Sequence, residues 1–552
     1  MRRYSSIDFL RGFMIFMMVV IHTPMRWYDR SWVEGSGDLE ISGLTAVFFL
    51  ILIFFSAWAG LFLMVSSVGN MISMQRNLDR GKSPVNIIMF QVVGGLLLLL
   101  FAVLVESTIG YHGYMGEVAE GSFDRWDMIL WRGFHMETIH TIAICVIING
   151  IVHGILSMKG GIRKPRRNMR IYAVLALLCI LFTIPMWELA EGIYPGYPFD
   201  TWYSTLAGRD IMVQYPVIGD SGIPEIILKS ILMPIAGAPE PIFPFLSISF
   251  IGSIIGIRMC QDKHDLRFPR KGIMIGAGIM ILGLIGSVIT IGSGTESIEI
   301  LIDHSYELPG LYPNMWLWWF LAITGAELAV VILTIRLVEY RGIGKQFAKG
   351  TTFFRRYGFV AFTVYTFQFL DVVPRLVFQL FPDLSGMYPF PDKVSPLLVI
   401  ILIPMVILTW EIILRSWEKI DYFGSLEWCM AKIVEKLMPG KRSNIGKTGR
   451  LPWWKVRRLD SREYLYKPTW LNLIGERSSD HDNLVDSKLS LWLSVFGFLF
   501  FPLSIISMAV SRYSIRFEGR NGYNGTALIL GVLGTVAAVI ELAVLSQVTI
   551  YF

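Results

Sequence analysis

Cysteine and charge are both scarce in this chain of 552 residues, and each scarcity excludes a class of protein. The cysteines stand singly and show no C-x-x-C or other metal-binding spacing; they are Cys145, Cys179, Cys260 and Cys429. None of the eight histidines lies in an H-E-x-x-H motif, and no glycine-rich phosphate loop occurs. Charged residues make up 17% of the chain, against about 25% in soluble proteins. The sequence therefore predicts a protein that is not soluble and that uses no metal.

Long hydrophobic runs fill most of the chain. Hydrophobic residues make up 54% of it, and the mean hydropathy is +0.55. Twelve runs are each long enough to cross a hydrocarbon core of about 30 Å. They lie at residues 7–24, 44–68, 86–109, 135–157, 171–190, 241–258, 273–292, 315–337, 358–379, 395–414, 488–510 and 526–550. The sequence thus predicts an all-α, polytopic integral membrane protein with about twelve transmembrane helices, ten in a core and two at the C-terminal end.

Lysine and arginine are distributed unevenly between the connecting segments. If the N-terminus is cytoplasmic, 36 of the 49 Lys and Arg residues fall in cytoplasmic segments, an excess typical of membrane proteins. We therefore expect a multi-pass protein of the plasma membrane, in a prokaryotic cell envelope, with both termini cytoplasmic. Arg512, Arg516 and Arg520 are exceptions, because this orientation places them outside. The net charge of +6 has the same explanation, so no nucleic-acid partner is expected.

Two ionisable residues, Arg11 and His22, interrupt the first apolar run. Such residues are so costly in a membrane span that function is their default interpretation. Eleven residues at about 100° each bring both side chains onto one stripe of a helix, roughly 16–17 Å apart along its axis. Ser5 and Asp8 have the spacing of a capping box, which predicts that the helix begins near Ser5.

The stretch SIDFLRGFMIFMMVVIHT resembles the first helix of the membrane acyltransferase superfamily, which includes acyltransferase-3 proteins and heparan-α-glucosaminide N-acetyltransferase-like proteins. Arg11 and His22 match the Arg, ten residues, His pattern of the first branch. The S-x-D-x-x-R-G opening is closer to the second branch. There an Asn replaces the residue at the place of His22, and the catalytic His comes later, shortly before a Trp. Here Asp29 and Arg30 occupy that later place, so the branch stays open and His22 is the catalytic candidate.

Two later stretches carry the same resemblance. Residues 417–428 look like the W…F-G-P-L-E-W ending of bacterial relatives, with Ser425 in place of the Pro. Residues 357–370, YGFVAFTVYTFQFL, look like their penultimate helix. The resemblance covers about residues 1–432. We expect this range to form an acyltransferase-like core, followed by a basic cytoplasmic linker and a two-helix membrane module at 433–487 and 488–552.

The resemblance implies transfer of an acyl group, with acetyl expected, from cytoplasmic acyl-CoA to a hydroxyl or amine of an extracytoplasmic glycan or glycolipid. Acetyl-CoA or another acyl-CoA would be the co-substrate. His22 would accept the proton of the acceptor, because the pKa of histidine lies near the working pH, or would carry the acyl group transiently. Arg11, whose guanidinium suits phosphate geometry, would bind the polar end of acyl-CoA together with Asp8. The Arg11–His22 separation is about the length of an extended pantetheine arm.

Four further ionisable residues are assigned to substrate binding. Glu137 and His140 lie at i,i+3, where a carboxylate is able to orient or acidify an imidazole. Asp371 and Arg375 lie at i,i+4 and are expected to pair with each other. A structural role is equally compatible with both pairs. Second-tier candidates are Glu106, His135, Glu188, Glu191, Glu327 and Glu411.

Two other functions compete with acyl transfer. A transporter or flippase of glycolipid or polysaccharide precursors also suits twelve spans and buried charges, although no clear internal repeat is visible. A non-catalytic membrane assembly subunit is the second alternative. The expected partners are membrane lipid, acyl-CoA and the glycan or glycolipid acceptor. The sequence leaves the acceptor, the acyl chain and the oligomeric state open, with a homodimer among the options.

Overall fold

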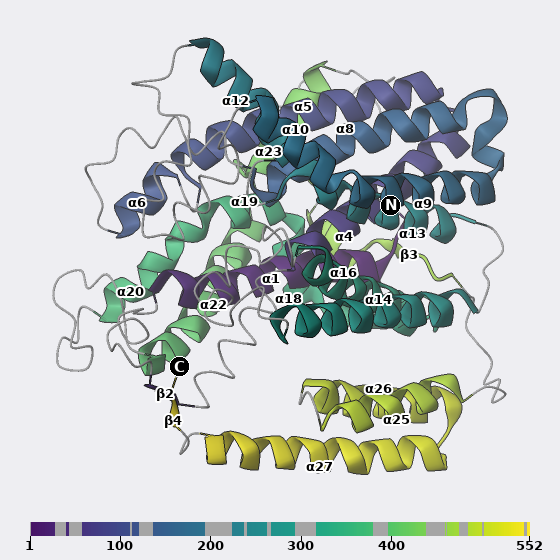
Figure 1. Ribbon diagram of the computed structural model, residues 1–552, viewed down its shortest axis with the longest axis vertical. Coiled ribbons are helices and arrows are strands. Elements are labelled where there is room, and N and C mark those ends of the chain that lie inside the picture. The colour runs from purple at the N-terminus through teal and green to yellow at the C-terminus, as the bar shows by residue number, and fades with distance from the viewer. Residues whose placement is uncertain are drawn as a thin grey trace. The chain divides into compact units, whose positions relative to one another are not determined.

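The computed structural model describes residues 2–27, 40–42, 58–110, 113–120, 136–193, 223–236, 240–261, 267–292, 316–378, 396–437, 459, 461–473, 484–498, 502–545 and 549–551. These residues are mainly helical (Figure 1), so the all-α prediction is confirmed for the part that is described. They belong to two compact units. Unit 1 comprises Met1–Asp29 and Phe55–Leu473, and unit 2 comprises Arg30–Phe54 and Ile474–Phe552.

Unit 1 holds most of the helices. They are α1 (Ser5–Trp27), α4 (Ala59–Asp79), α5 (Pro84–Thr108), α6 (Tyr114–Glu120), α8 (Thr138–Ser157), α9 (Pro165–Leu181), α10 (Thr183–Ile193), α12 (Ile223–Ala236), α13 (Ile242–Met259), α14 (Arg267–Gly292), α16 (Trp316–Val338), α17 (Gly344–Gly350), α18 (Thr352–Phe359), α19 (Ala361–Thr366), α20 (Val372–Phe378), α22 (Pro396–Glu418), α23 (Leu426–Leu437) and α24 (Ser461–Tyr466). Two 3-10 helices are η2 (Met158–Arg163) and η5 (Phe367–Asp371), and the strands are β1 (Arg2–Arg3) and β3 (Thr469–Trp470).

Six of the described helices are long and apolar enough to cross a membrane, namely α1, α5, α8, α13, α14 and α16. The number rises to eight if two bent pairs, α9 with α10 and α18 with α19 and α20, each count as one span. Apolar side chains also cover exposed helix faces: Leu100 of α5 is 54% exposed and Val288 of α14 is 68% exposed. Such faces suit lipid rather than water. The chain is therefore a multi-pass membrane protein; six to eight of its described helices are long and apolar enough to cross, and the number of twelve spans stays a prediction.

Small and polar residues bring α13 close to its neighbours. A methyl group on Gly252 would lie 2.5 Å from the carbonyl oxygen of Met64 in α4. Asn149 of α8 donates from Nδ2 to Ser249 Oγ at 2.6 Å and accepts from Ser253 Oγ at 2.8 Å. Within a membrane, close packing and such bonds hold helices together, because lipid supplies no hydrophobic driving force between them. This contact is the polar core of the α4, α8 and α13 layer.

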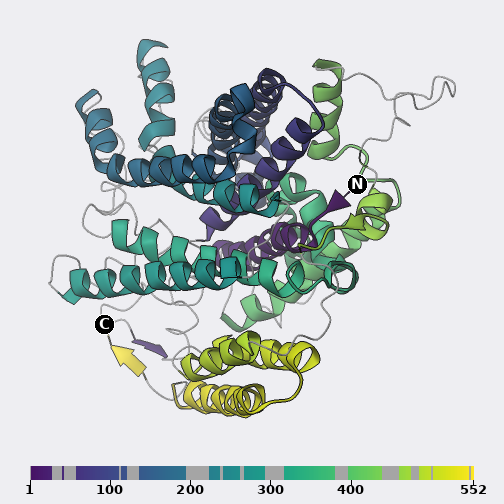
Figure 2. The same cartoon turned by 90° about the vertical axis from the view of Figure 1, so that its right-hand side faces the viewer.

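Helix α1 runs through the interior of unit 1 (Figure 2) and packs against α4, α16, α18 and α22. Gly12 lies at the crossing with α18, where an added methyl group would be 1.8 Å from the carbonyl oxygen of Phe354. A methyl group on Gly358 would in turn lie 2.8 Å from the backbone nitrogen of Gly12. The two glycines let the backbones touch, which fixes the neighbouring Arg11 against α18.

The predicted span over 358–379 begins at a sharp bend. Helices α18 and α19 meet at Val360 with a bend of 79°. The carboxylate of Glu427, in α23, accepts hydrogen bonds from the backbone N–H groups of Phe362 at 2.6 Å and Thr363 at 3.3 Å. Side-chain acceptors and negative charge both stabilise a helix start. Glu427 therefore stabilises the start of α19, close to the N-terminal edge of the predicted span.

The predicted span over 171–190 is interrupted by a bend within it. Helices α9 and α10 meet at Phe182 with a bend of 48°. Pro185 lies in the first turn of α10, where its missing N–H costs no intrahelical bond. Its ring is incompatible with an unbroken helix through Leu181, four residues earlier. The position of this proline accounts for the bend.

Residues 461–473, which the sequence assigns to the linker, belong to unit 1. Strand β3 pairs in parallel with β1 at the N-terminus. The backbone N–H of Leu471 donates to the carbonyl of Arg3 at 2.8 Å, and that of Leu473 donates to the carbonyl of Glu339 at 3.1 Å. These bonds extend the compact core well past the predicted boundary at residue 432.

Unit 2 contains helices α25 (Val485–Phe496), α26 (Pro502–Glu518) and α27 (Gly522–Leu545). The carboxylate of Glu518 accepts from the N–H groups of Asp486 at 3.0 Å and Ser487 at 2.9 Å, so α26 ends where α25 begins. The two helices are therefore antiparallel, and the predicted single span over 488–510 is wrong. Pro502 explains the difference, because proline has no N–H and restricts the residue before it.

The remaining contacts of unit 2 place both ends of α27. Asn521 donates from Nδ2 to Ser487 Oγ at 2.9 Å, so α27 begins beside the start of α25. Strand β4 (Thr549–Tyr551) pairs antiparallel with β2 (Glu40–Ser42). The C-terminal strand is thus joined to the part of the chain that follows α1.

Candidate functional site

Arg11 and His22 lie on one continuous helix, as expected. Helix α1 begins at Ser5 and runs without a break past both residues, which places them roughly 16–17 Å apart along its axis. The predicted capping box is wrong, because the carboxylate of Asp8 accepts from Arg3 at 2.9 and 3.0 Å. The carboxyl group of Glu339 instead accepts from the backbone N–H of Ser6 at 3.0 Å and caps the helix.

Three guanidinium groups surround the side chain of Tyr464, in α24. Arg11 donates from Nη2 to the Tyr464 hydroxyl at 3.3 Å. The guanidinium carbon of Arg3 lies 3.9 Å from the centre of the Tyr464 ring, and that of Arg355 lies 5.5 Å from it. Arginine stacks readily on aromatic rings, so one tyrosine holds three like charges in a small volume.

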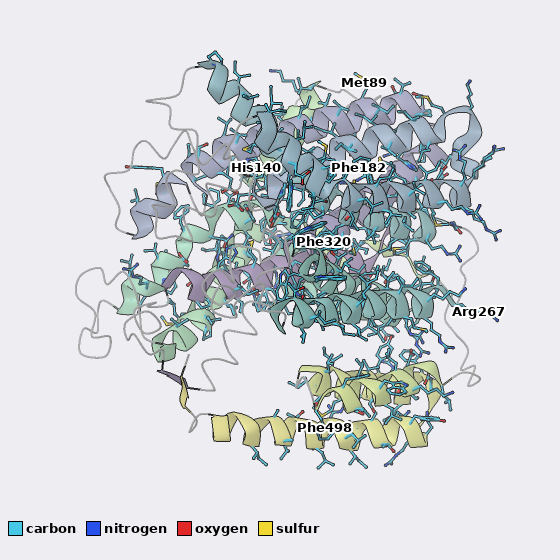
Figure 3. All side chains as sticks on the ribbon, viewed as in Figure 1. Met89, His140, Phe182, Arg267, Phe320 and Phe498 are labelled. Atoms are coloured by element: carbon cyan, nitrogen blue, oxygen red, sulfur yellow. The ribbon has the colours of Figure 1, made fainter. Side chains whose placement is uncertain are left out.

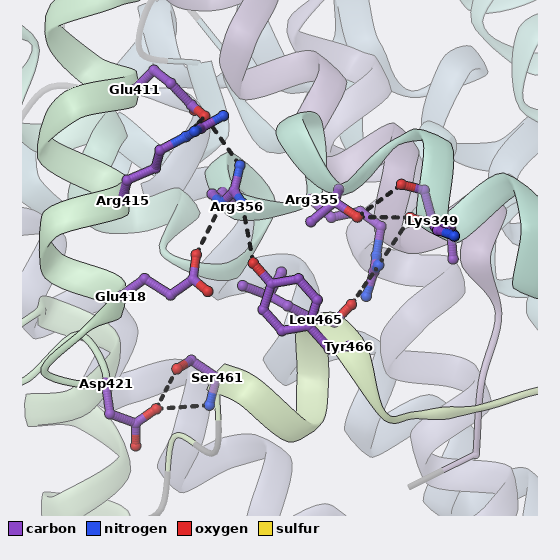
Figure 4. Close-up of polar contacts among 12 residues, drawn as sticks. Lys349, Arg355, Arg356, Glu411, Arg415, Glu418, Asp421, Ser461, Leu465 and Tyr466 are labelled. Atoms are coloured by element: carbon purple, nitrogen blue, oxygen red, sulfur yellow. Dashed lines mark hydrogen bonds and ion pairs between the residues drawn. The ribbon is translucent and has the colours of Figure 1, made fainter.

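Arg355, in α18, is fully buried and is held by the backbone of the 461–470 segment (Figure 4). Its Nη2 donates to the carbonyl of Tyr464 at 2.7 Å, and its Nη1 donates to that of Leu465 at 3.0 Å. Its guanidinium also lies 4.4 Å from the centre of the Trp470 ring. A segment that is distant in the sequence therefore supplies much of the environment of this charge.

The cluster carries an excess of positive charge. Asp8 balances one arginine and the Glu427 carboxylate interacts electrostatically with Arg11, while burial raises the pKa of Glu339 to about 8 and so disfavours a third negative charge. Within the described part of the chain, the buried Nε–H groups of Arg11 and Arg355 have no hydrogen-bond acceptor. Guanidinium groups with open donors suit carboxylate or phosphate oxygens. The Arg11 end of α1 thus has the chemistry of an anion-binding site.

The other half of α1 faces the broken helix. Gln368, in η5, donates from Nε2 to the sulfur of Met18, one helical turn before His22, and to the carbonyl of Tyr365 at 2.8 Å. The Tyr365 hydroxyl donates to Glu137 Oε2 at 3.3 Å. These contacts connect Met18 of α1, through Gln368 and Tyr365, to Glu137 at the start of α8.

Glu240 joins this region and was missed by sequence reasoning. Its Oε1 accepts from the Thr138 hydroxyl at 2.8 Å, and its backbone N–H donates to the carbonyl of Met136 at 3.1 Å. Burial, followed by the nearby Glu137 carboxylate, raises the pKa of Glu240 to about 8. The available signal was an acidic residue between Pro239 and Pro241, at the start of an apolar run.

The other predicted site residues lie inside unit 1. His140 is fully buried in α8 (Figure 3), whereas Glu137 is the extended N-cap residue that precedes this helix. Asp371 ends η5 and Arg375 lies in α20, and both are buried. The pairing of Asp371 with Arg375 stays a prediction.

The second-tier residues fall into different settings. Glu106 and Glu327 are buried, and Glu188 is exposed. Glu411 accepts from Arg356 at 3.0 Å and also pairs with Arg415, which is a structural role at the side of α22. His135 lies outside the described residues, and the side chain of Glu191 is not described.

Comparison with known proteins adds no assignment. No model of a protein family matches the chain, and no curated protein is similar to it. In the described ranges, no group of three or more His, Cys, Asp or Glu side chains is placed to hold a metal ion. Function must therefore be argued from the two ends of α1.

Proposed function

We propose that this chain is an integral membrane acyltransferase. It moves an acyl group, with acetyl expected, from cytoplasmic acyl-CoA to a hydroxyl or amine of a glycan or glycolipid on the extracytoplasmic side. The observation that supports this is the division of α1 into an arginine cluster at one end and a histidine at the other. The membrane acyltransferase resemblance of residues 1–432 gives the reaction and the acceptor class.

Each end of α1 has a separate role in this reaction. Arg11, with Arg3 and Arg355, binds the phosphates of acyl-CoA, because guanidinium groups match phosphate oxygens. The pantetheine arm then extends along α1 toward His22, a separation of roughly 16–17 Å. Asp8 orients Arg3 through its two hydrogen bonds. Binding of the acceptor falls to the region of Glu137, His140, Asp371 and Arg375.

The chemical step is a general-base reaction. An imidazole nitrogen of His22 takes the proton of the acceptor hydroxyl or amine while the acceptor oxygen or nitrogen attacks the thioester carbonyl. The carbon–sulfur bond then breaks, and the leaving CoA thiolate takes from the His22 imidazolium the proton that came from the acceptor. A transient acyl-His is the variant route, in which the imidazole itself attacks first.

The same proposal includes a membrane topology. The N-terminus is cytoplasmic by the Lys and Arg distribution, in a plasma membrane. The antiparallel α25 and α26 bring Arg512 and Arg516 back toward the start of α25, which removes the exceptions to that distribution. Helix α27 then leads away from this end, and β4 pairs with β2. We therefore place the C-terminus outside, opposite to the sequence-based expectation.

A transporter or flippase is the second candidate function. The two bent pairs, α9 with α10 and α18 with α19, favour it, because transporters often build their substrate sites from broken helices. The two functions differ in one product. An acyltransferase releases free CoA, whereas a flippase moves lipid-linked sugar between leaflets and leaves acetyl-CoA intact.

The test uses the full-length protein in nanodiscs with acetyl-CoA. Free CoA is followed by mass spectrometry with and without a mixed pool of glycans and glycolipids. We expect slow hydrolysis that the acceptor pool accelerates, and His22→Ala should lower both rates by about 10²–10⁴-fold. The matched control is His153→Asn, because His153 is a buried histidine of α8 whose ring lies beside Tyr172. Absence of CoA release by the wild type, or an equal loss in both variants, would contradict the proposal.

A further inference from the structure

Residues 461–470 occupy the arginine cluster, and we call them the plug. The plug comprises α24 and β3, and it reaches the cluster from far along the chain. Its oxygen atoms take up guanidinium donors: the Tyr464 hydroxyl binds Arg11, while the Tyr464 and Leu465 carbonyls bind Arg355. These three oxygens hold the positions that the oxygens of an anionic ligand would take.

The plug is anchored at its margins. The Asp421 carboxylate accepts from the backbone N–H of Ser461 at 2.8 Å and from its hydroxyl, as Figure 4 shows. Arg356 donates to the Tyr466 hydroxyl at 3.1 Å, and strand β3 pairs with β1. These bonds hold the ends of the plug and leave Tyr464 between them. A movement of Tyr464 and its neighbours therefore does not require the whole segment to detach.

The plug neither neutralises the charge of the arginine cluster nor accepts all of its hydrogen bonds. All three of its oxygen ligands are neutral, whereas the cluster is positively charged, and burial raises the pKa of Tyr464, which keeps its hydroxyl protonated. The buried Nε–H groups of Arg11 and Arg355 also lack an acceptor in the described part of the chain. Hydrogen bonds between ionised partners are roughly twice as strong as neutral ones. An anion with several oxygens thus competes well with the plug.

We propose that the plug closes a phosphate-binding site formed by Arg3, Arg11 and Arg355, and that a phosphate-bearing anion opens the site by displacing Tyr464. The inference rests on the proposed function for one point, that the anion is the CoA end of acyl-CoA. A phosphate headgroup of an anionic lipid has the same chemistry. The plug makes the site autoinhibited, because the empty site is closed by the protein's own chain.

The first experiment measures CoA binding by calorimetry to the full-length protein in nanodiscs of phosphatidylcholine. Tyr464→Phe removes the hydroxyl that occupies Arg11, so CoA should bind about 2- to 10-fold more tightly, as expected for one competing hydrogen bond. Tyr466→Phe is the matched control, because it removes the same hydroxyl two residues later from Arg356. It should leave the affinity unchanged. Weaker or equal binding by Tyr464→Phe would overturn the proposal.

The second experiment needs no variant. Hydrogen exchange of residues 461–470 is measured in the wild type before and after addition of CoA, and in nanodiscs that contain phosphatidic acid in place of part of the phosphatidylcholine. Faster exchange with CoA supports the plug with CoA as the occupant. Faster exchange with phosphatidic acid alone supports the plug and assigns the occupant to a lipid headgroup. Unchanged or slower exchange in both arms overturns it.

These results are independent of catalysis. If CoA opens the plug but the protein releases no CoA from acetyl-CoA, the phosphate site is supported and the acyltransferase function is contradicted. If the protein turns over acetyl-CoA but exchange in the plug does not change with CoA or phosphatidic acid, the acyltransferase function is supported and the plug is contradicted. The two proposals therefore fail separately.

Discussion

The two ends of α1 differ in the chemistry of the groups that surround them. The Arg11 end gathers guanidinium groups, which stay charged at any working pH. The other half of α1 contacts Gln368 through Met18, and Tyr365 connects this region to Glu137, which lies near Glu240, a group whose pKa burial raises to about 8. The first set is suited to holding an anion and the second to exchanging protons. In the proposed function, this difference assigns anion binding to one end of α1 and proton transfer to the other.

The largest effect is expected from the titration of Glu240. The pKa of this group is raised by burial from 4.5 to about 8, so the folded state binds its proton more tightly than the unfolded state does. Its contribution to stability is complete below pH 4.5 and is lost as the pH rises to about 8, on the order of 5 kcal/mol across that window. The Glu240→Gln side chain cannot ionise, so the stability of this variant relative to the wild type should increase as the pH rises over that range. Thermal unfolding in nanodiscs at pH 5 and pH 8 measures the difference in stability between the variant and the wild type, and an equal difference at both pH values would show that Glu240 does not titrate as described.

The next largest effect is expected at the helix crossing beside Arg11. Gly12→Ala forces a methyl group to 1.8 Å from the carbonyl oxygen of Phe354, so it should destabilise the protein by about 3 kcal/mol. Gly69→Ala is the matched control, because Gly69 is a helical glycine of α4 with open space around it. This control should be neutral or slightly stabilising. Chemical unfolding measures the free energy of unfolding of both variants. Equal values for Gly12→Ala and Gly69→Ala would show that the crossing of α1 and α18 tolerates displacement.

The smallest effect is expected away from both ends of α1. Ser249→Ala removes the hydroxyl that accepts from Asn149 and contacts Ser67, so it should cost about 0.6 kcal/mol, as is usual for bonds between membrane helices. Turnover of acetyl-CoA should not change, because this layer of α4, α8 and α13 has no role in the proposed reaction. A large loss of turnover at constant stability would show that the division of roles along α1 is incomplete.

Local sequence patterns predict the course of α1 but not the contacts that distant segments make with it. The common helix of Arg11 and His22 follows from hydropathy and helical periodicity, whereas the start at Ser5 is expected from a capping box that the structure replaces with Glu339. The break at Val360 does not follow from local patterns, because its cause is the Glu427 carboxylate from more than sixty residues later. The same holds for Tyr464, whose contact with Arg11 spans most of the chain.

Proline positions in the sequence mark breaks that hydropathy does not show. Pro502 separates α25 from α26, and Pro185 lies at the bend between α9 and α10. Glu240 lies between Pro239 and Pro241, just before the start of α13, so prolines mark its position as well. Hydropathy sums apolar residues across such positions, so it joins segments that the backbone separates. The polar contacts that assemble the candidate site come from segments distant in the sequence, and spacing within one segment does not reveal them.

The most direct test of the account compares Arg11→Ala with His22→Ala in two measurements on the same preparations, CoA affinity and the rate of CoA release at saturating acetyl-CoA. We predict that Arg11→Ala weakens CoA binding by about 10- to 100-fold while the saturated rate changes little. His22→Ala should keep the affinity and lose the rate by about 10²-fold or more. Variants that lose affinity and rate together, or a His22→Ala protein that retains its rate, would contradict the division of roles along α1.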